Sequence, residues 1–308
     1  EMCIRDRVIA GKPDAPLAKV GNTRKKGTLV RFLPDDAIFE DVRFNYDTVF
    51  RRLQELAYLN RGLKIVFLDE RVSDPARRET TFHYEGGIID YVRYLNDGKT
   101  VLHDQPIYLE GQKDSVICRV AIQYTDGYTE SLFSYVNNIP TGEGGTHETG
   151  FKAAFTKMFN DYARRNGFLK EKDSNLTGED FREGLSCVLT TMVKNPQFEG
   201  QTKGRLGNSE VRPAVEGIIT QQLTDWLENL KNQEIAQQIV QKAIRAAQVR
   251  EWLALHLYNP RELQFNKPWT MCPAMPGLFE ERPVEGNAPS TAALPVRMER
   301  GRELVPSP

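Results

Sequence analysis

A run of apolar residues at alternate positions between Ser115 and Tyr124 limits the possible folds more than any other stretch of the sequence. The apolar side chains stand at every second position: Val116, Cys118, Val120, Ile122 and Tyr124. This period is that of a β-strand with one face in a core. Further strands are predicted at Pro106–Glu110 and Thr129–Asn137. A hairpin turn at Asp126-Gly127 is predicted to join Thr129–Asn137 to the strand that ends at Tyr124. We therefore expect a mixed or antiparallel sheet with one face toward solvent.

Apolar residues at helical spacing predict helices that can cover such a sheet. The predicted helices are Phe44–Asn60, Ile88–Leu95, Thr146–Asn166, Ser209–Leu230 and Glu234–Glu251. The stripe of the third comprises Phe151, Phe155, Met158, Phe159 and Tyr162, and that of the fourth comprises Val211, Val215, Ile218, Ile219, Leu223, Trp226, Leu227 and Leu230. Thr177 and Asp180 form a capping box before a short helix. Further strands are expected at Gly27–Phe32, Leu63–Leu68, Thr80–Tyr84 and Gly184–Val193.

Composition excludes several classes of protein. With 308 residues the chain has room for about two domains. Its 41 Lys and Arg balance 42 Asp and Glu, so no overall field attracts nucleic acid or an anionic membrane. Four cysteines without CxxC spacing favour neither a zinc site nor a disulfide framework. No apolar run approaches the ~18 residues of a membrane span, so we expect a soluble, cytoplasmic protein.

The two ends of the chain differ in texture from the rest. Met2–Arg7 shows neither a helical nor a strand period. Nine of the 17 prolines fall between Pro260 and Pro308, with no period around them. Such a composition is typical of disorder, which we expect from Trp252 onward.

The candidate site is the loop Gln201-Thr202-Lys203, which lies between Gly200 and Gly204. An amide and an ammonium on a glycine-flanked loop suit an anionic ligand, although a solvated surface charge is the commoner role of such a lysine. Gly144-Gly145-Thr146-His147 also suits anion binding at a helix start. We interpret it instead as a turn from strand to helix with Thr146 as the N-cap. His83 and His103 stand alone and are expected to be packing or surface residues.

Several strings, in order along the chain, carry a resemblance to a known family. They are Gly27-Thr28-x-Val30-x-Phe32-x-Pro34-Asp35, the run from Arg52 to Asn60, Tyr84-Glu85-Gly86-Gly87, Asn137-Asn138-Ile139, Gly144-Gly145-Thr146-His147, Arg182-Glu183-Gly184-Leu185 and Gln201-Thr202-Lys203. Together they resemble the B subunits of bacterial type II topoisomerases, most closely the gyrase B family. The likeness covers roughly Lys19–Glu251.

This resemblance implies an α+β fold. Residues 19–84 would be the C-terminal part of a GHKL (Bergerat-type) ATPase domain. Residues 85–251 would be a transducer domain of ribosomal-protein-like βαβ fold with a long C-terminal helix. Residues 1–18 and 252–308 do not match the family pattern. The general-base glutamate, the magnesium-binding asparagine and the ATP lid are absent from this sequence, so we expect the chain alone to be inactive.

The resemblance also implies roles for particular residues. Gln201 and Lys203 would contact the γ-phosphate of ATP. Thr28 would touch the adenine and Val30 would line its pocket. The implied cofactors are ATP and Mg²⁺, the metal held by residues outside this sequence, and the residues present suggest no metal ligands.

The function implied for the complete protein is ATP-dependent DNA topoisomerase activity. Its expected partners are the gyrase A protein, a second copy of itself and double-stranded DNA, with no membrane. The topoisomerase IV B protein is the nearest alternative, and a MutL-like repair ATPase is disfavoured by the strings above. A non-enzymatic dimerisation or nucleic-acid interaction module is the alternative of another class.

Overall fold

The computed structural model describes residues 2–5, 8–9, 12–14, 16, 18–22, 24, 26–28, 35–69, 71 and 78–257. Contacts group the chain into two units, Glu1–Glu251 and Trp252–Pro308. Of the second unit the structure describes only the end of a helix. The other described elements lie in the first unit.

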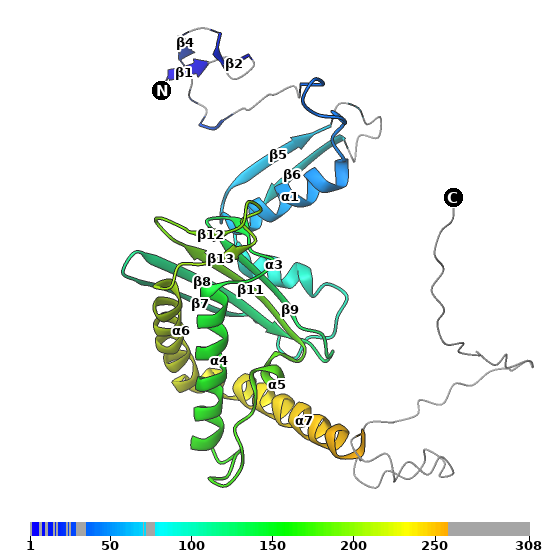
Figure 1. Ribbon diagram of the computed structural model, residues 1–308, viewed down its shortest axis with the longest axis vertical. Helices are drawn as coiled ribbons and strands as arrows, with labels where there is room; N and C mark the ends of the chain where they lie inside the picture. The colour runs from blue at the N-terminus through cyan, green and yellow to red at the C-terminus, as the bar shows by residue number, and fades with distance from the viewer. Residues whose placement is uncertain are drawn as a thin grey trace, which may run out of the picture. The chain divides into compact units, whose positions relative to one another are not determined.

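A five-stranded mixed sheet lies at the centre of this unit (Figure 1). Its strands in spatial order are β10 (Ile139–Pro140), β9 (Ser131–Val136), β11 (Leu185–Met192), β8 (Val116–Tyr124) and β7 (Ile107–Lys113). β11 runs antiparallel to β8 and parallel to β9, while β7 is antiparallel to β8. The mixed sheet expected from the sequence is confirmed.

The predicted hairpin at Asp126-Gly127 is wrong, because β11 lies between β8 and β9. The turn residues bond to distant segments instead. The Thr125 amide donates to the carbonyl of Gly184 at 2.9 Å, and the Asp126 amide donates to that of Thr100 at 3.0 Å. β11 is buried along most of its length, so its backbone groups need hydrogen-bond partners within the protein. A central position in the sheet gives them a hydrogen-bonded strand on each side.

Two helices cover one face of the sheet: α4 (Thr146–Arg165) and α6 (Val211–Glu228). All five alternating apolar residues of β8 are buried in the core beneath them, together with the predicted stripe of α4. A later helix, α7 (Gln233–Leu257), adds Ala236, Ile239 and Val240 to the same core. It continues past Glu251, so the disorder predicted from Trp252 is wrong for residues 252–257.

The opposite face is not open to solvent in its middle, contrary to expectation. The helix α3 (Ile88–Leu95) lies there and has the predicted bounds. A second cluster of buried residues joins this helix to the sheet, with Ala121 of β8 and Val188 of β11 fully buried in it. Because these side chains are small or branched apolar groups, α3 can pack against them and shield them from water.

One residue of the stripe predicted for α6 leaves the core. Leu230 is 77% exposed, in a short 3₁₀ turn (η1, Leu230–Asn232) that follows the end of α6. The side chain of Asn229 accepts a hydrogen bond from the Lys231 amide at 3.1 Å and caps this turn. Once the chain has left the helix, the period of the stripe no longer applies. The capping box at Thr177 and Asp180 is confirmed before α5 (Gly178–Arg182).

A helix and a hairpin precede the sheet in the chain. α1 (Tyr46–Leu59) is capped by the side chain of Asn45, and it packs on β5 (Lys64–Leu68) and β6 (Glu79–His83), which pair antiparallel. Ring contacts join Tyr46 to Phe67 and Phe50 to Phe82. Packing of these rings orients α1 on the hairpin.

The start of the chain departs from expectation. β1 (Met2–Arg5) pairs antiparallel with β4 (Ala18–Asn22), and β2 (Val8–Ile9) pairs with β3 (Lys12–Pro13), although Met2–Arg7 has no strand period. Gly27 and Thr28 lie outside any strand. The remainder of the strand predicted at 27–32 is outside the described residues. In the part of the chain that is described, no helix is long and apolar enough to cross a membrane.

The turn between β9 and β10 links the sheet to α1. Its two asparagines, Asn137 and Asn138, have φ of 50° and 65°, a left-handed conformation that asparagine tolerates better than most residues. The Asn138 amide group donates to Oδ1 of Asn60 at 3.0 Å. Nη2 of Arg52 donates to the carbonyl of Asn138 at 2.8 Å. Polar contacts from one turn thus reach two residues of the α1 region.

We expect substitutions of Asn138 to separate its backbone role from its side-chain role. Asn138→Gly keeps the left-handed backbone but loses the bond to Asn60, at a cost of about 1 kcal/mol. Asn138→Ala loses the same bond and also adds about 1 kcal/mol of backbone strain. Urea unfolding of the two variants measures the difference, and equal stability of Asn138→Gly and Asn138→Ala would contradict the strain.

Candidate functional site

Gln201 and Lys203 lie on the tip of a short hairpin. Its strands are β12 (Phe198–Glu199) and β13 (Arg205–Leu206), which pair antiparallel. The side chains of Gln201, Thr202 and Lys203 are all exposed. Gly200 has φ of 74° and Lys203 has φ of 55°, so the tip turns back through left-handed backbone at both sides. We refer to residues 200–204 as the tip.

The base of the hairpin is held by the segment Thr141–Gly145, which we call the strap. The Glu143 amide donates to the carbonyl of Gly204 at 3.0 Å, and the Leu206 amide donates to that of Gly144 at 3.2 Å. Leu206 itself is buried in the main core. At Gly145 an added Cβ would lie 2.6 Å from the backbone nitrogen of Leu206, so only glycine permits this close approach.

Asparagine side chains hold the segments that flank the hairpin. Oδ1 of Asn208 accepts from the Gln197 amide at 2.6 Å, and its Nδ2 donates to the carbonyl of Asn195 at 3.2 Å. Asn137 bonds to both backbone groups of Val193, with its Nδ2 donating at 2.8 Å and its Oδ1 accepting at 2.9 Å. The tip is therefore exposed, while the chain before and after it is fixed at several points.

A buried group of polar side chains lies under the strap. Thr141 and His147 are nearly fully buried, and Oγ1 of Thr141 lies 3.1 Å from Nε2 of His147 and 2.8 Å from Oγ of Ser134. Oγ of Ser134 lies 3.3 Å from Oε2 of Glu148. Burial lowers the pKa of His147 from 6.5 to about 4, so the ring is neutral near pH 7. We call Ser134, Thr141, His147 and Glu148 the Thr141 cluster.

The structure corrects the prediction for Thr146. The N-cap of α4 is Gly145, which has no side chain to cap the helix, and Thr146 is the first helical residue. Oγ1 of Thr146 is buried without a hydrogen-bond partner. Gly144 and Gly145 do make the turn from strand to helix, with φ of 74° and 141°. Sequence reasoning found a turn here and missed that Thr141 and His147 meet beneath it.

Of the other predicted site residues, the structure describes Thr28. Thr28 is exposed, and in the part of the chain that the structure describes it forms no hydrogen bond with Gln201 or Lys203. Val30 lies outside the described residues. Of the isolated histidines, His103 is buried and accepts from the Tyr124 amide, whereas His83 is exposed beside Glu85. Within the described ranges no group of three or more His, Cys, Asp or Glu gathers to hold a metal.

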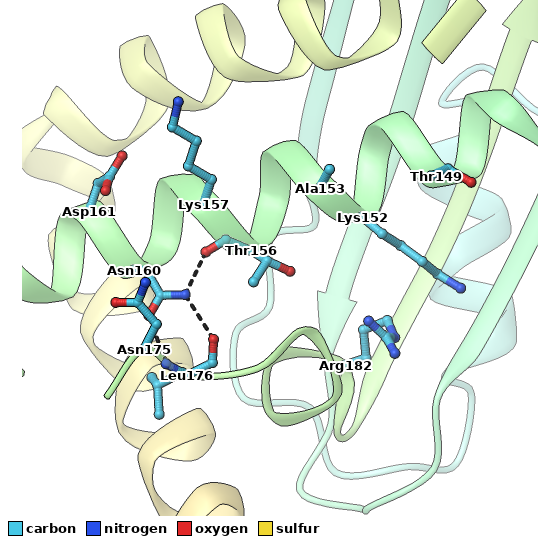
Figure 2. Close-up of a pocket in the computed structure, with 10 residues that line it drawn as sticks. All are labelled: Thr149, Lys152, Ala153, Thr156, Lys157, Asn160, Asp161, Asn175, Leu176 and Arg182. Atoms are coloured by element: carbon cyan, nitrogen blue, oxygen red, sulfur yellow. Dashed lines mark hydrogen bonds between the residues drawn. The ribbon is translucent and has the colours of Figure 1, made fainter. Parts of the chain in front are cut away.

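A hollow of about 550 Å³ lies along α4, away from the tip residues (Figure 2). Two of its three basic side chains pair with carboxylates: Lys152 with Glu148 at 2.6 Å, and Arg182 with Glu130 at 3.0 Å. The amide group of Asn160 donates to the carbonyls of Thr156 and Leu176, both at 2.9 Å, as the dashed lines show. Its polar groups therefore hold the segment before α5 against α4.

Known proteins share both the fold and the matched stretch of sequence. The model of the DNA gyrase B family matches residues 87–254. This chain belongs to the DNA gyrase B family. The DNA gyrase B protein of Clostridium acetobutylicum is 48% identical over 242 residues, which cover 78% of this chain. The matched part is 37% of that relative, so the chain spans little more than a third of its length.

Solved structures agree with the family. The 43K ATPase domain of Thermus thermophilus gyrase B, in complex with an aminocoumarin, has a TM-score of 0.68 at 35% identity and covers 83% of this chain and 68% of its own. The topoisomerase IV ATP-binding domain of Francisella tularensis, bound to a small-molecule inhibitor, has a TM-score of 0.61 at 28% identity, covering 78% of this chain and 64% of its own. These likenesses confirm the predicted fold class, a GHKL ATPase part with a transducer.

The neutral His147 predicts how stability depends on pH. Between pH 6.5 and about 4 the unfolded chain binds a proton at this histidine that the folded protein does not. Stability therefore falls as pH is lowered through this window, and the contribution of His147 is fully present only above it. The full shift corresponds to about 3 kcal/mol.

His147→Gln isolates this contribution from those of other groups, including His103, whose pKa burial also lowers. We expect the difference in unfolding free energy between the native protein and His147→Gln to shrink as pH falls below 6.5. Urea unfolding at a series of pH values measures this difference. A difference that does not change with pH would mean that the pKa of His147 is the same in the folded and unfolded states, and would contradict the lowered pKa.

Proposed function

We propose that this chain contains the part of a gyrase B protein that senses the γ-phosphate of ATP, through Gln201 and Lys203. The observation that carries the proposal is an exposed amide and ammonium on a tip whose base is fixed to the core. The nucleotide would be held by the ATPase domain, and the tip would reach it from the transducer side. Such a site is composite, with each part supplying some of the contacts.

Elementary chemistry supports these roles. The ammonium of Lys203 can donate to a phosphate oxygen, and a hydrogen bond between charged groups contributes roughly 1.5–3 kcal/mol. The amide of Gln201 adds a neutral donor beside it. Negative charge is spread over the γ-phosphate oxygens during phosphoryl transfer, so a positioned ammonium also lowers the barrier.

The remaining site residues and cofactors complete the proposal. Thr28 would hydrogen-bond toward the adenine and Val30 would line the adenine pocket. ATP would bind together with Mg²⁺, whose ligands lie in other parts of the complete protein. When bound, Mg²⁺ would neutralise charge on the phosphates, while the residues of this chain orient the γ-phosphate.

In the complete protein we propose ATP-dependent supercoiling of double-stranded DNA, carried out with the gyrase A protein in the bacterial cytoplasm. ATP would bring two copies of the gyrase B protein together. A contact between Lys203 and the γ-phosphate exists only before phosphate release, so hydrolysis changes which arrangement of the domains is favoured.

A topoisomerase IV B protein is the second candidate, since a topoisomerase IV ATP-binding domain shares the fold at 28% identity. The same tip would act on the same ligand in that enzyme. Gyrase is favoured by the family match and by the relative at 48% identity. Assay of the complete protein with the gyrase A protein on relaxed and on catenated DNA decides between supercoiling and decatenation.

Lys203→Ala in the complete protein tests the proposed contact. Loss of one charge-assisted hydrogen bond to the γ-phosphate lowers the ATPase rate by about 10- to 100-fold, with supercoiling reduced in parallel. The measurement is steady-state ATPase activity together with thermal unfolding, which we expect to be unchanged because the side chain is exposed.

Lys172→Ala is the matched control, because Lys172 is also an exposed lysine on a loop. It should leave the ATPase rate within about twofold of the native enzyme, within the small effects typical of surface substitutions. Native turnover in Lys203→Ala rules out the sensing role. A complete protein that binds no ATP analogue at all would instead indicate an interaction module without enzymatic activity.

A further inference from the structure

We infer that Thr141 is a positioning residue for Lys203: its buried hydroxyl fixes the strap, and the strap fixes the tip. This inference rests on the proposed function of the tip. Among the described residues Thr141 forms no hydrogen bond with Gln201 or Lys203, so its effect would pass through the main chain of the strap.

The first step is the attachment of Thr141 to the sheet. It is 1% exposed, and its amide donates to the carbonyl of Ser134 on β9 at 2.9 Å. Its own carbonyl accepts from the Gly144 amide at 2.8 Å and lies 3.0 Å from Oγ of Ser134. Backbone and side chain of Thr141 are therefore both bonded, and the first turn of the strap is closed on itself.

The second step is the direction of the hydrogen bonds within the Thr141 cluster. One arrangement gives every proton an acceptor: Nε2–H of His147 donates to Thr141, the Thr141 hydroxyl to Ser134, and the Ser134 hydroxyl to Glu148. The chain ends on a carboxylate that pairs with Lys152 at 2.6 Å. In a buried site such a chain is stronger than its separate bonds, because each bond polarises the next.

In this arrangement Thr141 is the central member, and it joins three elements. Ser134 belongs to β9, Thr141 to the strap, and His147 and Glu148 to the first turn of α4. Among the described residues Nδ1 of His147 has no partner and is buried, and the ring bonds to Thr141 alone. Removal of the Thr141 hydroxyl would leave both nitrogens of a buried ring unpaired, which forces the strap or the helix start to move.

The third step leads from the strap to the tip. Gly204 follows Lys203 directly, and its carbonyl accepts a hydrogen bond from the Glu143 amide. Glu143 lies two residues after Thr141 in the strap. Leu206 donates to Gly144, and Gly145 lies against its backbone. A displacement of the strap therefore shifts the main chain beside Lys203. Because catalytic contacts depend on position to within about 0.5 Å, a small shift lowers the rate without removing the lysine.

Thr141→Val in the complete protein tests this inference, since valine keeps the shape and removes only the hydroxyl. We expect kcat for ATP hydrolysis to fall about tenfold with the KM for ATP changed by less than about threefold, because position rather than binding area is lost. Thr141→Ser restores the hydroxyl and should recover the rate. Thr224→Val removes a hydroxyl that bonds only within α6, and should not change it.

The second readout is coupling to Lys203. If Thr141 acts through the tip, Thr141→Val lowers the rate in the native background but by less than about twofold in the Lys203→Ala background. If Thr141 has only a structural role, Thr141→Val lowers the rate by the same factor in both backgrounds. That result would overturn the inference. Native kcat in Thr141→Val also overturns it.

The third readout does not need ATP hydrolysis, so it separates this inference from the proposed function. Thr141→Val should speed hydrogen exchange of the Glu143 and Leu206 amides at least tenfold, since these amides bond across the strap and the hairpin. Unchanged exchange contradicts the inference even if Lys203 proves to have no sensing role. Should Thr141→Val fail to fold, Ser134→Ala breaks the same chain of bonds and is read in the same three ways.

Discussion

The position of β11 between β8 and β9 determines most of this structure. The strand pairs along its whole length with β8, from Leu185 opposite Tyr124 to Met192 opposite Ile117, and along most of it with β9 in parallel. Parallel neighbours cannot be joined by a tight turn, so the chain must cross a face of the sheet between them. The helix α4 makes that crossing, and its apolar stripe forms the core with β8. The same strand ends beside Asn137, whose side chain bonds to Val193 and determines where the segment leading to the tip begins.

The tip combines an exposed end with a base that is bonded to the rest of the fold, for a physical reason. A hairpin of two-residue strands has little stability alone. Here the main chain is bonded at Gln197, Gly204 and Leu206, and the side chain of Leu206 is buried. The loss of conformational entropy is therefore met by contacts with the strap and the core rather than within the hairpin itself. Lys203 keeps its ammonium in water, and only the direction in which the tip is presented is fixed.

Local patterns predicted local structure well, and contacts between distant segments account for the errors. The stripe of α4, the bounds of α3 and the capping box at Thr177 depend on residues within a few positions of one another, so the sequence suffices for them. The turn at Asp126-Gly127 was assigned to a hairpin because the residues of β8 and β9 do not indicate that β11 lies between these two strands and pairs with both. Leu230 continues the helical spacing, yet Asn229 has already ended the regular helix. The tip was predicted from its own residues and the family likeness. The Thr141 cluster was not, because its members come from three elements and carry no shared spacing.

The two kinds of contact around the tip suggest where the protein would move. The strap, the hairpin and β9 are joined by main-chain bonds and by the buried side chain of Leu206, which have one good arrangement. Between α1 and the sheet the contacts are of another kind. Arg52 and Asn60 bond to a single turn through partly exposed polar groups, while Tyr58 stacks on Tyr91 of α3, both rings buried, with ring centroids 4.9 Å apart. Partly exposed hydrogen bonds exchange with water at little net cost. Movement of α1 relative to the sheet is therefore expected at its joint with the Asn137-Asn138 turn. The tip would move as one body with the sheet.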